Sequence, residues 1–251
     1  MPETFLKRTY GRPAEWEQAG LAWLAEAEAA GGAEVVRVIA RSDDGLTENH
    51  VSSVAPSARF AAEFGQRLAA THTLTAGVWG EGPAGWSGPG YQGPNDHLLE
   101  LSLTPHESWG AMYSAERVLP LVRQLDMGTG DRAVFERLGE RLAAGDFDTA
   151  DAPARLHGDL WAGNVLWAER GCVLIDPSAH VGHRETDLAA LALFGCDHLA
   201  RILAAYDAAH PLADGWRERV GLHQLSMVLM HAVVFGGGYA AQGLAIARRY
   251  A

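Results

Sequence analysis

Residues 156–166 read LHGDLWAGNVL, and residues 173–177 read VLIDP. The apolar residues that end the first stretch and begin the second predict two short strands with a turn between them. A hairpin of this kind would bring Asp159, Asn164 and Asp176 to the same end. We therefore expect these three polar side chains to share one site.

The spacing of these residues is typical of phosphoryl transfer. In protein kinases an aspartate and an asparagine stand five positions apart in the catalytic loop, and a metal-binding aspartate follows on a short hairpin. The first carboxylate orients the attacking hydroxyl and accepts its proton, while the other two side chains bind Mg²⁺ beside the nucleotide phosphates. The pattern therefore predicts Asp159 as the catalytic residue, Asn164 and Asp176 as metal ligands, and ATP and Mg²⁺ as cofactors.

Longer motifs resemble those of one particular family of kinases. The sequence HGDLWAGN at 157–164, the Asp-Pro pair at 176–177 and GHRETDL at 182–188 resemble the fructosamine kinase (ketoamine kinase) family. That family is a branch of the aminoglycoside-phosphotransferase-like kinases. The resemblance extends from about Phe5 to the C-terminus. It implies an α+β, protein-kinase-like two-lobe fold with a reduced N-terminal β-lobe and a mainly helical C-terminal lobe.

The resemblance also implies a boundary between the lobes. A truncated N-lobe would occupy residues 1–51, and a helical C-lobe that contains the catalytic loop 156–164 would occupy residues 52–251.

The nucleotide contacts implied by the resemblance lie in the N-lobe. Kinases use a strand lysine to contact the α- and β-phosphates, and a glutamate on the following helix orients that lysine. Lys7 and Glu17 match these positions. Glu48, Asn49 and His50 would form the adenine-facing hinge, where backbone groups make the hydrogen bonds.

The phosphate loop is the main departure from the family. Its members carry two strands and a glycine-bearing loop before the lysine, whereas this sequence has only Met1 to Thr4 there, and neither GxGxxG nor GxxxxGK[ST] occurs elsewhere. The sequence therefore predicts either a true start upstream of the recorded one or a shortened kinase with altered nucleotide binding.

Other residues have supporting or acceptor-side roles by the same resemblance. His157 and Trp161 flank the catalytic aspartate, and Asp187 would brace the backbone of the catalytic loop. The weaker candidates for contact with the acceptor are Trp86, Asn95, His183, Arg184, Glu185, Trp216 and His231. Packing within the fold is the alternative for each of these weaker candidates.

The implied acceptor is a ketoamine: ribulosyl- or fructosyl-lysine, free or on a glycated protein, phosphorylated at the sugar O3. Two alternatives keep the fold, namely a phosphotransferase of the aminoglycoside or choline kinase type and a nucleotide-impaired pseudokinase that binds a partner. A third alternative is a non-haem iron site of His157, Asp159 and His183. The helical pattern around these residues disfavours it, because such oxygenases are built from many alternating strands.

Composition limits the partners. The 251 residues include 20 Lys+Arg and 31 Asp+Glu, so the net charge of −11 offers no broad surface for nucleic acid. Cys172 and Cys196 lack CxxC spacing, as expected in a reducing cytoplasm. The sequence has no N-terminal signal pattern and no apolar run of the ~20 residues that a spanning helix needs. We therefore expect a cytoplasmic protein without nucleic-acid or membrane partners, and the oligomeric state is left open.

Hydrophobic periodicity predicts the remaining elements. Strands are expected at 4–8, 35–40 and 45–51, and helices at 15–27, 56–73, 106–126, 131–144, 185–194, 197–209, 214–235 and 239–250. Residues 74–96 are rich in Gly and Pro and are expected to form a long loop or a flap on the acceptor side.

Overall fold

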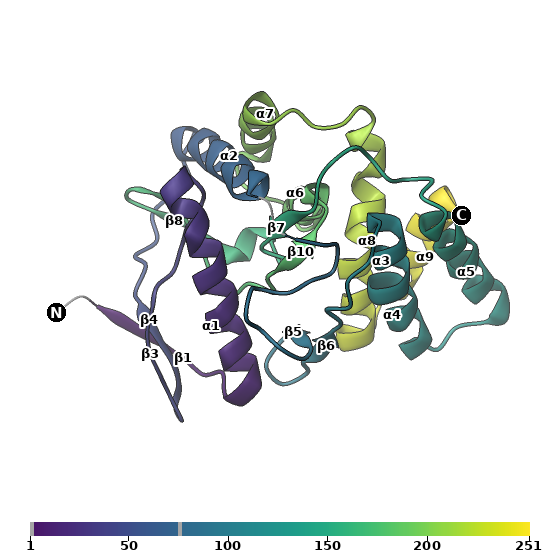
Figure 1. Cartoon of the computed structure of the whole chain (residues 1–251), viewed down its shortest axis with the longest axis horizontal. Helices are drawn as coiled ribbons and strands as arrows, with labels where there is room; N and C mark the ends of the chain where they lie inside the picture. Colours follow the sequence, from purple (N-terminus) through teal and green to yellow (C-terminus); the bar gives the residue numbers. More distant parts are fainter. Residues whose placement is uncertain (1–2, 75–76) are drawn as a thin grey trace.

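The computed structural model describes residues 3–74 and 77–251 of the chain (Figure 1), so positions 75–76 of the predicted loop lie outside the described part. The strands are β1 (Thr4–Lys7), β2 (Glu34–Val35), β3 (Val38–Ser42), β4 (Gly45–Asn49), β5 (Gly90–Gln92), β6 (Leu99–Leu101), β7 (Ala154–Leu156), β8 (Val165–Ala168), β9 (Gly171–Leu174) and β10 (His180–Gly182). The helices are α1 (Gly11–Ala25), α2 (Ala58–Thr73), α3 (Trp109–Met112), α4 (Leu119–Gln124), α5 (Thr129–Ala143), α6 (Arg184–Leu193), α7 (Leu199–Ala209), α8 (Trp216–Phe235) and α9 (Tyr239–Tyr250). Within the described ranges, no helix is both long and apolar enough to cross a membrane.

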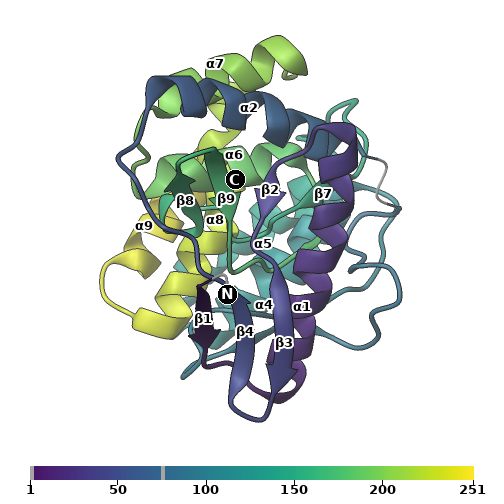
Figure 2. The same ribbon diagram turned by 90° about the vertical axis from the view of Figure 1, so that its left-hand side faces the viewer.

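A small antiparallel sheet with strand order β1-β4-β3 lies near the N-terminus, and α1 runs beside it (Figure 2). Lys7 at the end of β1 is the register partner of Leu46 in β4. Gly45 has a φ of +129°, and a Cβ there would lie 2.0 Å from the carbonyl oxygen of Lys7. A glycine is therefore needed where the β3–β4 turn approaches β1.

The strand predicted at 35–40 is divided between two sheets, so this prediction was wrong. Val35 belongs to β2, which pairs in parallel with β9, whereas β3 begins at Val38 and pairs with β4. Val36 donates a backbone hydrogen bond to the carbonyl oxygen of Leu174 (2.9 Å). Burial of Val35 and Val36 in the core accounts for the division, and it attaches the N-terminal segment directly to the hairpin.

The hairpin predicted from residues 165–175 is confirmed. β8 and β9 pair antiparallel, with Val165 opposite Leu174. The neighbouring strands β7 and β10 form a second antiparallel pair, with Leu156 opposite His180. The catalytic loop runs from β7 to β8 through a 3₁₀ turn at Ala162–Asn164, so it lies next to the segment that leaves β9.

Helices form most of the remaining chain. α2 packs on α7, and Gly65 permits this contact because a Cβ there would lie 2.2 Å from the carbonyl oxygen of Ile202. α6 packs on α8, and α8 packs on α9. The helix predicted at 106–126 begins instead at Trp109, since the Ser108 hydroxyl caps it by accepting the Ala111 N–H (3.2 Å).

That helix also contains a π-helical segment, Tyr113–Val118, between α3 and α4. A π segment rotates the following residues relative to a regular helix, and such segments are frequent at functional sites. Propensity and periodicity do not distinguish it from an α-helix, so the sequence did not predict it.

Two hydrophobic cores support these elements. The first joins the β8–β9 hairpin to α1, α2 and α7, with Leu24, Leu68 and Leu174 among its buried members. The second joins α3–α5 to α8 and α9, with Phe135 and Leu225 among its members. The catalytic loop is therefore fixed to a packed framework on one side and faces solvent on the other.

Candidate active site

One cavity of about 320 Å³ collects the residues predicted to carry the chemistry. Asp159 and Asn164 reach it from the catalytic loop, and Asp176 reaches it from the segment after β9. Lys7 from β1 and Glu17 from α1 line the same cavity. The predicted convergence of three polar side chains is therefore present in the structure.

Asn164 holds Asp159 in place. Its Nδ2 donates to the carbonyl oxygen of Asp159 (2.8 Å) and to the carboxylate Oδ2 of Asp159 (3.1 Å). Burial raises the pKa of the Asp159 carboxyl, although His157 and the hydrogen bond from Asn164 oppose this effect. Because both amide hydrogen bonds use the nitrogen, the side-chain oxygen of Asn164 is left to bind a cation.

Asp176 and Lys7 form an ion pair across the cavity. Asp176 has a φ of +57°, a left-handed conformation that aspartate tolerates better than most residues. Its Oδ1 lies 2.7 Å from the Nζ of Lys7, and the same Nζ lies 2.6 Å from Oε1 of Glu17. Burial lowers the pKa of Lys7, but the two carboxylates outweigh burial and raise it overall. The lysine is therefore charged and held between two acids.

His157 supports the loop without reaching the cavity. Its ring Nε2 lies 2.8 Å from the carbonyl oxygen of Ile175, and its Nδ1 accepts the backbone N–H of Asp159 (3.3 Å). These partners make Nε2 the donor and Nδ1 the acceptor of the ring. The imidazole therefore connects the catalytic loop to the segment that carries Asp176.

Asp187 braces the catalytic loop as predicted. Its Oδ2 accepts the N–H of His157 (2.7 Å), and its Oδ1 accepts the N–H of Gly158 (3.0 Å). His72 Nε2 lies 3.2 Å from Oδ2, and His72 Nδ1 lies 2.8 Å from the hydroxyl of Tyr206. Burial would raise the pKa of Asp187, but its hydrogen bonds hold that pKa below its usual value. The carboxylate is therefore ionised and fully engaged.

The predicted hinge residues lie in two places. Asn49 and His50 line a separate cavity of about 360 Å³, together with Val36 and Arg170. Glu48 is buried, and burial followed by the charge of Glu17 raises its pKa to about 7. These side chains do not line the cavity of Asp159 as far as the described residues go, so an adenine contact here would be made by the backbone.

Some predicted acceptor-side residues reach the main cavity. His231, Trp161 and Asn95 line it, and Asn95 donates to the backbone carbonyl oxygen of Arg8 (2.9 Å). Trp86 packs against Trp16 instead, with ring centroids 5.3 Å apart. Trp216 packs against the first hydrophobic core and is also absent from the described lining of the cavity.

The cavity is also lined by residues that the sequence did not single out, among them Trp16, Tyr91, Gln92 and Met230. The carbonyl oxygen of Tyr91 accepts hydrogen bonds from Trp16 Nε1 (2.9 Å) and from the hydroxyl of Ser178 (2.9 Å). These bonds fix β5, which lies in the segment predicted as a loop or flap, to the wall of the cavity. The only available signal was the Gly/Pro content of that segment.

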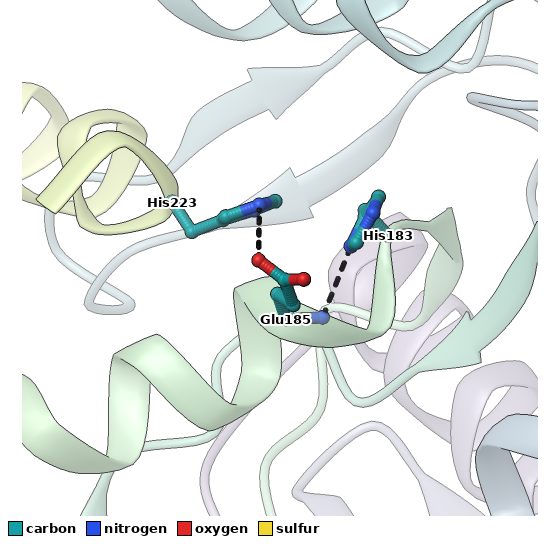
Figure 3. Close-up of side chains that lie close together, drawn as sticks. All are labelled: His183, Glu185 and His223. Carbon is teal, nitrogen blue, oxygen red and sulfur yellow. Dashed lines mark hydrogen bonds and ion pairs between the residues drawn. The ribbon is translucent and has the colours of Figure 1, made fainter. Parts of the chain in front are cut away.

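His183 and Glu185 lie away from the cavity, in a buried network (Figure 3). Arg184 is also buried, and it donates to Asp151 (2.9 Å). Arg219 donates to both carboxylate oxygens of Glu185 (2.5 and 3.0 Å), and His223 Nε2 lies 3.3 Å from Oε2. Burial would raise the pKa of Glu185, but its hydrogen bonds with His223 and Arg219 lower it to about 2. These contacts stabilise the start of α6.

The same network contains the one group of three potential metal ligands found among the described residues, His183, Glu185 and His223. It does not fit a metal ion, because the guanidinium of Arg219 already occupies both oxygens of Glu185. The iron site considered from His157, Asp159 and His183 does not form such a group in the described part of the chain.

The architecture matches that of phosphotransferases. The structure of an aminoglycoside phosphotransferase, the gentamicin complex of APH(2")-IIa, superimposes with a TM-score of 0.60 over 98% of this chain and 84% of that chain, at 12% identity. At this identity the likeness concerns the fold alone. The predicted α+β, kinase-like two-lobe fold is confirmed.

Sequence comparison identifies the family. The model of the fructosamine kinase family matches residues 14–250, and the chain belongs to this family. A solved structure of a candidate fructosamine-3-kinase from Thermobifida fusca is 37% identical, with a TM-score of 0.87 over 98% of this chain and 85% of that chain. Mouse ketosamine-3-kinase is 34% identical over 57% of this chain and 47% of its own length. The probable ketoamine kinase of Vibrio vulnificus is 31% identical over 72% of this chain and 59% of its own length. The chain therefore matches about half of the length of these curated relatives.

Proposed function

We propose that the chain is an ATP-dependent ketoamine kinase, which transfers the γ-phosphoryl group of ATP to a sugar hydroxyl. The observation that carries this proposal is the single cavity that contains Asp159, Asn164, Asp176 and Lys7. A base, two oxygen ligands and a cation are the groups that phosphoryl transfer requires. We also propose that the lobes divide between residues 51 and 52, after β4.

In the proposed reaction the acceptor oxygen forms a bond to the γ-phosphorus, and the bond from that phosphorus to the bridging oxygen of ADP breaks. Asp159 orients the acceptor hydroxyl and receives its proton. Its raised pKa suits this role, because a stronger base accepts the proton more readily. Lys7, oriented by Glu17, would contact the α- and β-phosphates once it is released from Asp176.

The residues of the cavity fit Mg²⁺. The side-chain oxygen of Asn164 and the carboxylate of Asp176 are hard oxygen ligands, which this ion prefers. When bound, Mg²⁺ would neutralise charge on the β- and γ-phosphates. The proposed cofactors are therefore ATP and Mg²⁺.

The proposed acceptor is ribulosyl- or fructosyl-lysine, free or on a protein, with transfer to the sugar O3. Its support is membership of the family and the likeness to a relative named ketosamine-3-kinase. Trp161, His231 and Phe235 line the cavity and supply rings against which a sugar could stack.

The test is phosphorylation of synthetic fructosyl-lysine and ribulosyl-lysine by the full chain with Mg²⁺ and ATP, followed by ³¹P NMR to locate the new ester. Asp159→Asn should abolish turnover while far-UV circular dichroism stays unchanged. Asp126→Asn, at an exposed aspartate, is the matched control and should keep full activity.

Two outcomes would contradict the proposal. Turnover of an aminoglycoside or of choline without turnover of either ketoamine would assign the fold to the other acceptor class. Binding of a ketoamine without ADP release under any nucleotide condition would identify a pseudokinase.

A further inference from the structure

Two small cavities of about 30 Å³ each lie behind the catalytic loop. One is lined by Asp159 and His223, and the other is lined by Trp109, Arg117 and His180. They share four lining residues: Gln92, Gly158, Thr186 and Ser226. Gly158 precedes the catalytic aspartate, so the contents of these cavities adjoin the backbone that positions it.

Arg117 is buried without a carboxylate partner in the described part of the chain. Its Nη1 donates to the carbonyl oxygens of Ser102 (2.8 Å) and Glu116 (3.3 Å), which carry no net charge. The carboxylate of Glu116 faces His106 instead, 2.9 Å from its Nε2. Burial lowers the pKa of Arg117 to about 10, so the guanidinium is still charged at neutral pH.

Two residues that line this cavity carry three buried N–H donors that have no acceptor among the described residues. They are Nε and Nη2 of Arg117 and Nε1 of Trp109, and both side chains are at least nine-tenths buried. The Trp109 nitrogen can only donate. Buried donors in native proteins are nearly always paired, so these three indicate an acceptor that the chain itself does not supply.

The charges around the cavity indicate that the missing acceptor is an anion. No aspartate or glutamate side chain is among the described residues that line the Arg117 cavity. His180 is uncharged, because burial lowers its pKa to about 3, and its Nδ1 donates to the carbonyl oxygen of Ser178 (2.8 Å). A buried cation without a counter-ion is strongly unfavourable, and a water molecule would satisfy donors without balancing the charge.

We propose that Arg117 and Trp109 bind one small monovalent anion, chloride, in this cavity. A cavity that holds a water needs roughly 10–15 Å³ on this scale, so the space admits one small ion and excludes phosphate and sulfate. Arg117 lies in the π-helical segment, and such segments are frequent at functional sites. The bound ion would stabilise the packing behind Gly158 and so hold the catalytic loop.

The first experiment compares the melting temperature of the full chain in sodium chloride and in sodium gluconate at equal ionic strength. Gluconate has the same charge but is too large for the cavity. The melting temperature should rise with chloride in a saturable manner and should not respond to gluconate. The protein should also broaden the ³⁵Cl NMR line of free chloride.

Variants locate the site. Arg117→Met should remove both the chloride response and the line broadening. Trp109→Phe, which removes one donor and keeps most of the ring, should weaken chloride binding about tenfold, and it provides a test if Arg117→Met fails to fold. Arg132→Met is the control, because Arg132 also donates to backbone carbonyls, of Val122 and Leu125, but does not line the cavity.

Three results would overturn the proposal. They are equal melting temperatures in chloride and gluconate, an unbroadened ³⁵Cl line, or a chloride response that survives in Arg117→Met or in Trp109→Phe with unchanged affinity. Any of these would mean that Arg117 and Trp109 do not bind chloride in this cavity.

Discussion

The Nζ of Lys7 lies 2.7 Å from Oδ1 of Asp176 and 2.6 Å from Oε1 of Glu17. Lys7 is the only lysine of the sequence, and it joins β1, α1 and the segment after β9. The residue proposed to contact phosphate therefore forms an ion pair with a residue proposed to bind Mg²⁺. The contact uses one carboxylate oxygen of Asp176, Oδ1, so Lys7 and the proposed Mg²⁺ would share this carboxylate or compete for it.

We expect Lys7→Met to lower kcat/KM for ATP by at least about a hundredfold, the usual effect of losing one preorganised donor to a developing charge. The variant also leaves two carboxylates close together without the cation between them. Steady-state kinetics with varied ATP measure the effect. Arg8→Met removes an exposed neighbouring charge and should have little effect. Similar kinetics for the two variants would exclude a role of Lys7 in nucleotide binding.

Asp187 provides a prediction that separates stability from chemistry. The two carboxylate oxygens of Asp187 accept the backbone N–H groups of His157 and Gly158. In Asp187→Asn the side-chain NH₂ group replaces one of these oxygens, so one backbone N–H would face another donor. We expect a loss of about 3 kcal/mol in the free energy of unfolding at pH 7. Asp207→Asn, where one oxygen accepts a single backbone N–H, from Leu212, is the matched control.

The pH dependence of that loss follows from the lowered pKa of Asp187. Its folded pKa is below the unfolded one, so the ionised carboxylate contributes stability above about pH 4, and this contribution disappears as the pH falls further. The difference between wild type and Asp187→Asn in urea unfolding should therefore shrink below pH 4. A difference that stays constant down to pH 2 would contradict the assigned charge state.

Local motifs predicted the site better than they predicted its surroundings. The hairpin around Asp159, Asn164 and Asp176 depends on short-range patterning, and it forms where the sequence predicted it. His72 bonds to both Asp187 and Tyr206, and these contacts join distant elements, so no spacing rule identifies them in full. Patterns within a short stretch of sequence do not predict which faces of α2, α6 and α7 pack together.

The incorrect strand at 35–40 and the position of Glu185 have the same origin. A run of apolar residues at 35–40 predicts one strand, but competition between two sheets for pairing divides it. The family resemblance made residues 183–185 weak candidates for acceptor contact, with packing as the alternative, and the structure shows packing, because Arg219 and His223 from α8 bind Glu185 in the interior. In both cases the partner comes from a distant part of the chain.

Glu48 gives a pH-dependent prediction of opposite sign. Burial and the nearby charge of Glu17 raise its pKa to about 7, above its unfolded value. A raised carboxyl pKa contributes stability below the unfolded pKa, and this contribution is lost as the pH rises through 7. Glu48→Gln should therefore stabilise the chain by about 2 kcal/mol at pH 8 relative to its effect at pH 5.

The measurement is urea unfolding of wild type and Glu48→Gln at both pH values. Glu34→Gln, at an exposed glutamate of β2, is the control and should show no such difference. An identical effect of Glu48→Gln at pH 5 and pH 8 would mean that Glu48 does not titrate in this range.

The contact between α2 and α7 depends on one missing side chain. In Gly65→Ala the new Cβ would lie 2.2 Å from the carbonyl oxygen of Ile202, so the helices would have to separate, at a cost of about 2 kcal/mol in the free energy of unfolding. Gly130→Ala in α5 meets no atom within 4 Å and should raise stability by about 0.5 kcal/mol, because alanine favours the helix. Chemical denaturation of both variants measures the expected loss of stability in Gly65→Ala and the expected gain in Gly130→Ala. Equal stability of the two variants would contradict the close approach of α2 and α7, and with it the packing of Tyr206 beside His72 that positions Asp187.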